Sequence, residues 1–231
     1  MSLPIFFYDQ PVAGAIITLP EETSKHIVQV LRMNAGEQLQ LTDGKGNLLT
    51  TTIVDAHKKK CSVKVIENNF QPQKEKKVSI AISLLKNNSR FEWFLEKATE
   101  IGVTDIIPLL CKRTEKQHFR YERMHQIVIA AMMQSQQVWL PVLHQPTLFE
   151  EAVKTSVFQH KLVAHCIDEQ KAHIHDYRSS TSVQILIGPE GDFTKEEIEL
   201  ALIHAYQPVS LGDTRLRAET AGIVAATVLC I

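Results

Sequence analysis

The chain has 231 residues, 44% apolar and 22% charged, with a formal net charge of −1 at pH 7, which excludes a uniformly basic nucleic-acid binder. It is long enough for a sizeable core, no apolar run approaches the roughly 20 residues of a membrane span, and no signal-peptide core follows Met1. Four widely spaced cysteines without a C-x-x-C pair argue against disulfides and a zinc site, so we expect a cytoplasmic protein.

The first 70 or so residues predict a small β-rich module. Alternating or clustered apolar residues predict strands over residues 5–8, 38–42, 48–54 and 61–66, with a hairpin turn at 43–47. An amphipathic helix is predicted over 21–31. Five or so short strands with one helix suggest a small barrel. Residues 70–77 are polar, include a proline and read as a linker, so we expect one domain over 1–72 and another over 73–231.

From residue 78 onward, predicted strands and helices alternate. The strands are expected at 78–85, 104–110, 161–166, 183–187 and 208–211, and the helices at 90–101, 121–137, from 194 and from 218. Such alternation predicts a mostly parallel sheet covered by helices on both faces.

Two glycine-bearing loops stand out in this second part. The strand ending at Ile187 leads into Gly188-Pro189-Glu190-Gly191-Asp192, and a helix then begins with a capping box formed by Thr194 and Glu197. A second strand ends at Leu211-Gly212, and a short loop leads into the last helix. A glycine turn between a strand and a helix N-terminus can hold a small polar ligand. Neither loop has the dinucleotide or triphosphate fingerprint, so we expect one pocket of another kind.

Four segments together resemble the RsmE family of SPOUT-superfamily methyltransferases. They are LIGPEGDFTKEE, LGDTRLRAETA, KNNSRFEWFLEKATEIGV at 86–103 and HIVQVLRMNAGEQLQLTDGKGN at 26–47, and with them the resemblance spans nearly the whole chain. The family uses S-adenosylmethionine to methylate N3 of a uridine in 16S ribosomal RNA. The resemblance implies a PUA-like β-barrel followed by a SPOUT α/β domain with a deep trefoil knot. It also implies a homodimer that acts on ribosomal RNA, in our reading within the small ribosomal subunit.

The chain departs from the family pattern at two positions. Asp192 stands where the family often has a second glycine, which we expect to be mild because aspartate is a good helix-capping residue. Gln137 stands where the family often has an arginine, so no role is carried over to that position.

The resemblance assigns the cofactor to the two loops. The expected cofactor-binding residues are Ile187, Gly188, Pro189, Glu190, Gly191, Leu211, Gly212, Leu216 and Thr220. For Glu190 three roles remain open: a solvated carboxylate, an acceptor that orders the loop, or a partner of the sulfonium cation.

The expected catalytic residues are Arg217 and Glu219. Uracil N3 must lose its proton as it attacks, and the negative charge then spreads onto the flanking carbonyl oxygens. A guanidinium at such an oxygen would stabilise the anion, so Arg217 is assigned to that role. Glu219 or solvent takes the proton. The plain alternative is a surface arginine beside a glutamate that stabilises a helix N-terminus.

RNA contact is expected from local basic patches, because residues 1–77 carry 10 Lys/Arg against 8 Asp/Glu. The segment 112–123 mixes basic and aromatic residues, which suits phosphates and unpaired bases, although an ordinary exposed loop would look similar. The assigned RNA-binding residues are Lys25, Arg32, Lys60, Lys86, Arg90, Arg113 and Arg120.

Other clusters are expected to carry no chemistry. His165, His173 and His175 have no third ligand at recognisable spacing, so no metal site is expected. The carboxylates of Glu92, Glu96 and Glu100 recur at helical spacing and are expected to form a solvated face. Two other functions stay open: methylation of another RNA atom such as a ribose 2′-oxygen, and RNA binding without catalysis.

Overall fold

The structure is a computed structural model that describes residues 3–12, 14–167 and 170–231. It divides into two compact units, one formed by Met1–Gln73 with Met132–Leu140 and the other by Lys74–Ala131 with Pro141–Ile231. Among the described residues, no helix is both long and apolar enough to cross a membrane.

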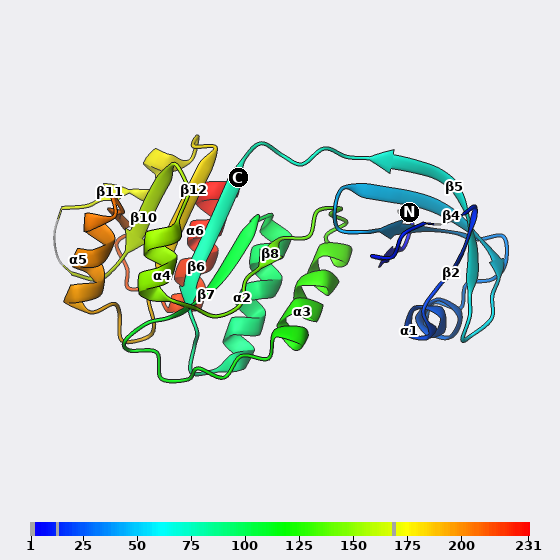
Figure 1. The fold of residues 1–231 in the computed structure, drawn as a ribbon, viewed down its shortest axis with the longest axis horizontal. Coiled ribbons are helices and arrows are strands. Elements are labelled where there is room, and N and C mark those ends of the chain that lie inside the picture. The colour runs from blue at the N-terminus through cyan, green and yellow to red at the C-terminus, as the bar shows by residue number, and fades with distance from the viewer. Residues whose placement is uncertain (1–2, 13, 168–169) are drawn as a thin grey trace. The chain divides into compact units, whose positions relative to one another are not determined.

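The first unit is built on a curled five-stranded sheet (Figure 1). Its strands are β1 (Ile5–Phe7), β2 (Ile16–Thr18), β3 (Gln38–Thr42), β4 (Asn47–Asp55) and β5 (Ser62–Phe70), in the spatial order β1-β3-β4-β5-β2. β1 is parallel to β3, and the other pairs are antiparallel. The short strand β2 is not among the predicted elements.

Apolar residues that alternate with polar ones along the strands form the core of this unit. Leu39 and Leu41 of β3 are fully buried and pack with Ile53, Val63 and Ile27. Helix α1 (Glu21–Lys25) continues into a π-helical turn, η1 (His26–Val30), which confirms the predicted helix. The predicted hairpin turn is also present.

The carboxylate of Asp43 closes that turn by accepting the backbone N–H of Lys45 at 2.8 Å and the Asn47 side-chain amide at 2.7 Å.

The segment Met132–Leu140 belongs to the first unit although it lies far along the chain. The Trp139 indole N–H donates to the Gln71 carbonyl at 2.8 Å, and its ring meets Phe70 edge to face. The backbone N–H of Gly46 donates to the Val138 carbonyl at 2.9 Å. No pattern in the sequence predicts this packing.

The second unit contains an eight-stranded sheet whose neighbouring strands are all parallel. The spatial order is β11-β13-β10-β12-β6-β7-β8, with β9 paired to β7. The strands are β6 (Lys77–Ser83), β7 (Asp105–Leu110), β8 (Val142–Leu143), β9 (Thr147–Leu148), β10 (His160–Ala164), β11 (Ala172–His173), β12 (Ser182–Ile187) and β13 (Gln207–Ser210). The predicted parallel sheet is confirmed.

Helices cover both faces of this sheet (Figure 1). They are α2 (Asn88–Ile101), α4 (Phe149–Thr155), η2 (Ile174–Tyr177), α5 (Lys195–Ile203) and α6 (Ala218–Cys230). Helix α3 (Tyr121–Gln134) begins in this unit, and its last three residues belong to the first unit. On one face, α4 and α5 bury Phe149, Val153 and Ile198 against the sheet. On the other face α6 packs against α2 at Gly222, where a Cβ would come within 2.6 Å of the Phe94 ring.

Two further details differ from the sequence prediction. Helix α3 ends at Gln134, not at residue 137, because Gln136 takes φ +57°, which a continuing helix does not allow. The short elements β8, β9, α4, β11 and η2 were not predicted, since each is too short to show a periodic pattern.

Candidate functional site

The two glycine loops emerge at the same edge of the sheet. Ala164 of β10 pairs with Ile187 of β12 on one side and with Val209 of β13 on the other. Both flanking strands therefore end level with β10, about 10 Å apart. In a parallel sheet this carboxyl edge is where ligands bind.

The first loop is ordered by Asp192, which has φ +64°. This is the left-handed region that glycine occupies most easily, which accounts for a glycine being common there. The Asp192 carboxylate accepts the backbone N–H of Cys166 at 2.8 Å and that of Phe193 at 2.8 Å. Our expectation that Asp192 is tolerated as a helix cap is therefore wrong, because the cap of α5 is Thr194, in the predicted capping box with Glu197.

Glu190 orders the loop from the other side. Its carboxylate accepts the backbone N–H of Lys86 at 3.1 Å, although the residue itself is exposed. Of the three roles left open for Glu190, the structure displays the ordering one. The glycine loop is thereby tied to the loop that follows β6.

Arg113 contacts the same loop from the segment that follows β7. Its Nη1 donates to the carbonyl of Gly191 at 2.7 Å and to that of Phe193 at 3.3 Å. A Cβ on Gly191 would meet the aliphatic stem of Arg113 at 3.4 Å. One nitrogen of this guanidinium, Nη1, is thus occupied by hydrogen bonds within the protein.

The second glycine loop is more open. Gly212 has φ +138°, a conformation that side chains rarely allow, and a Cβ there would meet nothing within 4 Å. Ser210 steadies the strand end, since its hydroxyl hydrogen-bonds both the N–H and the carbonyl of Gly212. Leu211 and Leu216 are half-buried at the two ends of the loop.

A pocket of about 360 Å³ lies where this loop enters α6. Its lining combines two arginines, a carboxylate, two hydroxyls and an indole, from Ser89, Arg90, Trp93, Arg217, Glu219 and Thr220. Thus Arg217, Glu219, Thr220 and Arg90, predicted for three different roles, are brought together. The other predicted cofactor residues are not among the described residues that line it.

The two predicted catalytic residues differ in exposure. Arg217 is the N-cap residue of α6 and is exposed, whereas Glu219, in the first turn, is only 7% exposed. The Glu219 carboxylate lies 3.6 Å from Nε of Arg90. Arg90 therefore neutralises the buried carboxylate, and the guanidinium of Arg217 stays available at the rim.

Trp93 was missed by the sequence reasoning. It lies one helical turn after Arg90 on α2 and is 44% exposed in the pocket wall. The only signal was its place in the segment 86–103, where α2 periodicity puts it beside Arg90 instead of on the buried side of Phe91 and Phe94.

The RNA-binding residues predicted on the first unit are exposed. Within the described chain, the side chains of Lys25, Arg32 and Lys60 make no hydrogen bond or ion pair. Arg32 also holds φ +57°, a cost of about 1 kcal/mol for a side chain at a position that suits glycine.

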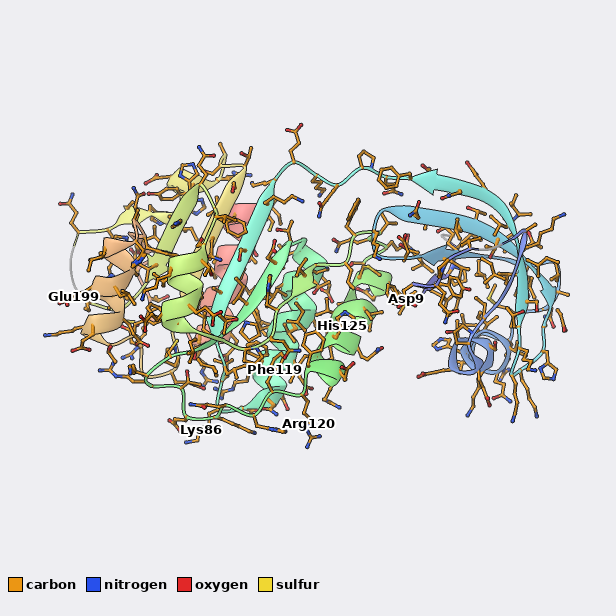
Figure 2. All side chains as sticks on the ribbon, in the orientation of Figure 1. Asp9, Lys86, Phe119, Arg120, His125 and Glu199 are labelled. Carbon is orange, nitrogen blue, oxygen red and sulfur yellow. The ribbon has the colours of Figure 1, made fainter. Side chains whose placement is uncertain are left out.

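The RNA-binding residues predicted on the second unit already have intramolecular partners. Lys86 pairs with Glu115 at 2.8 Å, which raises the pKa of its ammonium group, and Arg120 donates to His118. Lys86 and Arg120 project from the loops at the lower edge of this unit (Figure 2). Exposed pairs of this kind are weak, and phosphates can replace them.

The aromatic residues of segment 112–123 are partly used in packing. Phe119 meets Phe91 edge to face at 6.0 Å, and Tyr121 stacks on His125 and donates to the Leu143 carbonyl. The RNA interpretation of this segment assumed that these rings are free to stack on bases. Phe119 and Tyr121 instead already pack against other side chains of the protein.

The carboxylates expected to be a solvated face are paired. Glu92 makes two hydrogen bonds with Arg123, at 2.6 and 2.9 Å, which hold the pKa of that carboxyl below its usual range. Lys97 bridges Glu96 and Glu100. Of the three histidines, His173 caps the turn η2 and stacks on His175. No group of three His, Cys, Asp or Glu side chains that could hold a metal occurs in the described parts of the chain.

Comparison with known proteins finds two matching domain families. Residues 72–230 match an RNA methyltransferase domain, and residues 19–66 match an RNA methyltransferase PUA domain. The chain is 32% identical to ribosomal RNA small subunit methyltransferase E of Synechocystis, over 94% of this chain and 73% of that protein.

Solved structures agree with this. A probable rRNA-methyltransferase from Porphyromonas gingivalis superposes with a TM-score of 0.91 at 36% identity, covering 99% of this chain and 98% of the other. Ribosomal RNA small subunit methyltransferase E from Neisseria gonorrhoeae, solved bound to S-adenosylmethionine, superposes with a TM-score of 0.87 at 25% identity, covering 99% and 97%.

Proposed function

The chain belongs to the RNA methyltransferase family, and we propose that it transfers the methyl group of S-adenosylmethionine to N3 of a uridine in 16S ribosomal RNA. The observation that carries the proposal is the pocket at the start of α6. There an exposed arginine, Arg217, directly follows a glycine loop at the carboxyl edge of the sheet. Two comparisons support this reaction: the similar proteins are named as ribosomal RNA methyltransferases, and one of them was solved bound to S-adenosylmethionine.

The two glycine loops are proposed to hold the cofactor. Bound there, S-adenosylmethionine supplies an already activated methyl group, so the protein has only to orient it. The residues proposed to contact it are Ile187, Gly188, Pro189, Glu190, Gly191, Leu211, Gly212, Leu216 and Thr220. The fit is supported by Gly212, whose bare backbone borders open space where main-chain groups can approach a ligand.

Catalysis is assigned to Arg217 and Glu219. As N3 attacks, its proton leaves and negative charge develops on the flanking carbonyl oxygens of the base. The exposed guanidinium of Arg217 donates hydrogen bonds to one of these oxygens and stabilises the anion. Glu219 or solvent takes the proton, and Arg90 keeps this carboxylate oriented toward the pocket.

RNA is proposed to bind through both parts of the chain. Residues 1–72 form the PUA-like RNA-binding domain, which contacts phosphates with Lys25, Arg32 and Lys60. Residues 73–231 form the methyltransferase domain, apart from the segment Met132–Leu140 that belongs to the first unit. On the second domain Lys86, Arg90, Arg120 and the Arg113 nitrogens that the loop carbonyls do not use add further contacts. The target uridine must be unpaired or flipped to reach the pocket.

The assembly follows from the family. We propose a cytoplasmic homodimer with a deep trefoil knot in each methyltransferase domain, acting on 16S RNA within the small ribosomal subunit. The strand order supports the knot, since the chain leaves β13 near one end of the sheet and returns in α6 to β6, β12 and α2.

Incubation with methyl-labelled S-adenosylmethionine and isolated small subunits tests the reaction. Label is expected in 16S RNA, with none in RNA from cells that already contain the active enzyme, because the site there is occupied. Absence of transfer to any RNA, together with no cofactor binding by calorimetry, would favour an RNA-binding protein without catalysis.

A further inference from the structure

The segment that follows β7 holds the first glycine loop at two points. At the first, Arg113 donates to the carbonyls of Gly191 and Phe193, and its stem packs against Gly191. These carbonyls flank Asp192, the one residue of the turn with a left-handed backbone conformation and a side chain. Arg113 therefore holds the turn on both sides of its most strained residue.

The second point is Glu197, a buried carboxylate in the first turn of α5. One oxygen accepts the backbone N–H of Lys112 at 2.8 Å, and the other accepts that of Thr194 at 2.8 Å. Buried acceptors are costly to leave unsatisfied, so this bridge is stable only while both segments keep their places. The residues on either side of the peptide bond 112–113 thus both hold the C-terminal end of the glycine loop, where it leads into α5.

The same segment carries basic residues outward. Arg113 has five N–H donors, of which the loop carbonyls engage Nη1. The following residues reach Glu115, which pairs with Lys86, and continue to exposed Arg120 (Figure 2). Lys86 in turn donates its backbone N–H to Glu190 of the glycine loop. The Arg113 guanidinium, which RNA phosphates can reach, is therefore hydrogen-bonded directly to the backbone of the proposed cofactor loop, and Lys86 is linked to that loop through the Glu190 carboxylate.

From these contacts we infer that Arg113 is a positioning residue for the cofactor loop, and that through it RNA binding and cofactor binding are coupled. The inference rests on the proposed function. A phosphate bound by the outer nitrogens of Arg113 fixes the guanidinium against the Gly191 and Phe193 carbonyls and so favours the loop conformation that binds the cofactor. Coupling of this kind is reciprocal: the cofactor strengthens RNA binding by the same factor.

The test measures S-adenosylmethionine affinity by calorimetry, without RNA and with a saturating RNA fragment that contains the target. Without RNA, Arg113→Ala should bind the cofactor about tenfold more weakly, as expected for losing hydrogen bonds from a charged donor. Arg113→Lys, which keeps a charge but loses the planar fork, should fall in between. Lys195→Ala is the matched control, because it removes a cation close to the loop that makes no contact with its carbonyls, and should bind like the unaltered protein.

Saturating RNA should tighten cofactor binding severalfold in the unaltered protein and leave it unchanged in Arg113→Ala. The thermal midpoint of Arg113→Ala should stay close to that of Lys195→Ala. Unaltered cofactor affinity in Arg113→Ala without RNA would overturn the positioning role and leave only RNA contact. A large loss of thermal stability would reduce Arg113 to a structural residue. If the unaltered protein itself binds no cofactor, it is the proposed function that fails.

Discussion

Arg217 is the side chain to which we assign stabilisation of the anion that forms on the base. It precedes α6, is exposed at the pocket and lies beside a carboxylate that another arginine already neutralises. A guanidinium that stays exposed at the rim of the pocket can stabilise the anion that forms on the uracil base. This combination was visible in the sequence only through the family resemblance, because an arginine before a helix is otherwise an ordinary surface residue.

Replacing Arg217 by alanine should lower the methyl-transfer rate by roughly 10²–10³-fold, as does loss of an oxyanion donor. Cofactor affinity should barely change, and Arg217→Lys should be intermediate. Raising the pH should partly rescue the alanine variant, because more uridine is then ionised by solvent. Single-turnover kinetics at several pH values measure this, and a full-rate alanine variant would return Arg217 to the surface-residue interpretation.

Substitution of either loop glycine by valine should abolish cofactor binding, but for a different physical reason at each position. At Gly212 a side chain has room, but φ +138° is nearly restricted to glycine and costs about 1–3 kcal/mol, so Gly212→Val should shift the loop and abolish cofactor binding while the fold is retained. At Gly188 a Cβ would lie 3.2 Å from the Phe193 nitrogen, so Gly188→Val should disturb the loop from within and also lose the cofactor.

Calorimetry with S-adenosylmethionine and circular dichroism check both variants. Gly14→Val, at a position with open space, is the control for the effect of a valine as such. Unchanged affinity in either loop variant would remove that loop from the cofactor site.

At the scale of elements, local chemistry made much of the second unit predictable. Buried apolar runs identified the main strands, and Thr194 with Glu197 identified the start of α5 from two residues. Gly102, at φ +100°, ends α2 where the sequence indicated. Contacts between residues distant in sequence determine the short elements and the packing of residues 132–140 on the first unit. No local sequence pattern therefore predicts them.

The candidate site shows the same division. The two loops follow from strand and glycine signals, and the parallel register explains why they meet. Three features could be seen only in the structure. They are the left-handed backbone of Asp192, the hydrogen bonds of Arg113 to the loop carbonyls and the position of Trp93 in the pocket wall. The sequence places these residues in suitable segments, but it does not show their partners, such as the backbone of Cys166 for Asp192 and that of Gly191 for Arg113.

The basic surface of the first unit gives a prediction at this scale. Reversing charge at Arg32 and Lys60 together should weaken RNA binding and lower the slope of log affinity against log salt by about 1–2, because each phosphate contact to single-stranded RNA contributes about 0.7. Cofactor affinity should stay the same. Filter binding at several salt concentrations measures the slope.

Lys45 and Lys64 provide the control, since they lie on the same unit, are exposed and stand outside the predicted RNA set. Reversing both changes the net charge equally. If the two double variants weaken RNA binding alike, the effect is one of overall charge, and the barrel surface around Arg32 is not the main phosphate contact.

At the scale of the molecule, α6 leaves a partly exposed stripe of small and apolar side chains. Its members recur at helical spacing at Thr220, Ile223, Val224 and Thr227. Trp93 of the neighbouring helix α2 is also exposed. We expect a second copy of the chain to cover part of this surface.

Light scattering at micromolar concentration should therefore give the mass of a dimer, twice 26.1 kDa. Ile223→Glu, which places a charge in the stripe, should shift the population toward monomer, whereas Lys195→Glu on the exposed side of α5 should not. A monomeric mass for the unaltered chain would contradict the dimer.

The central claim is the position of the methyl group, and nucleoside mass spectrometry of 16S RNA tests it most directly. RNA from a strain lacking this protein should contain no 3-methyluridine at the affected site. Adding the purified protein and S-adenosylmethionine to its small subunits should restore one such nucleoside, and the Arg217→Ala variant should restore it far more slowly. A methyl group found on a ribose 2′-oxygen or another base, or 3-methyluridine that persists in the strain without the protein, would contradict the account.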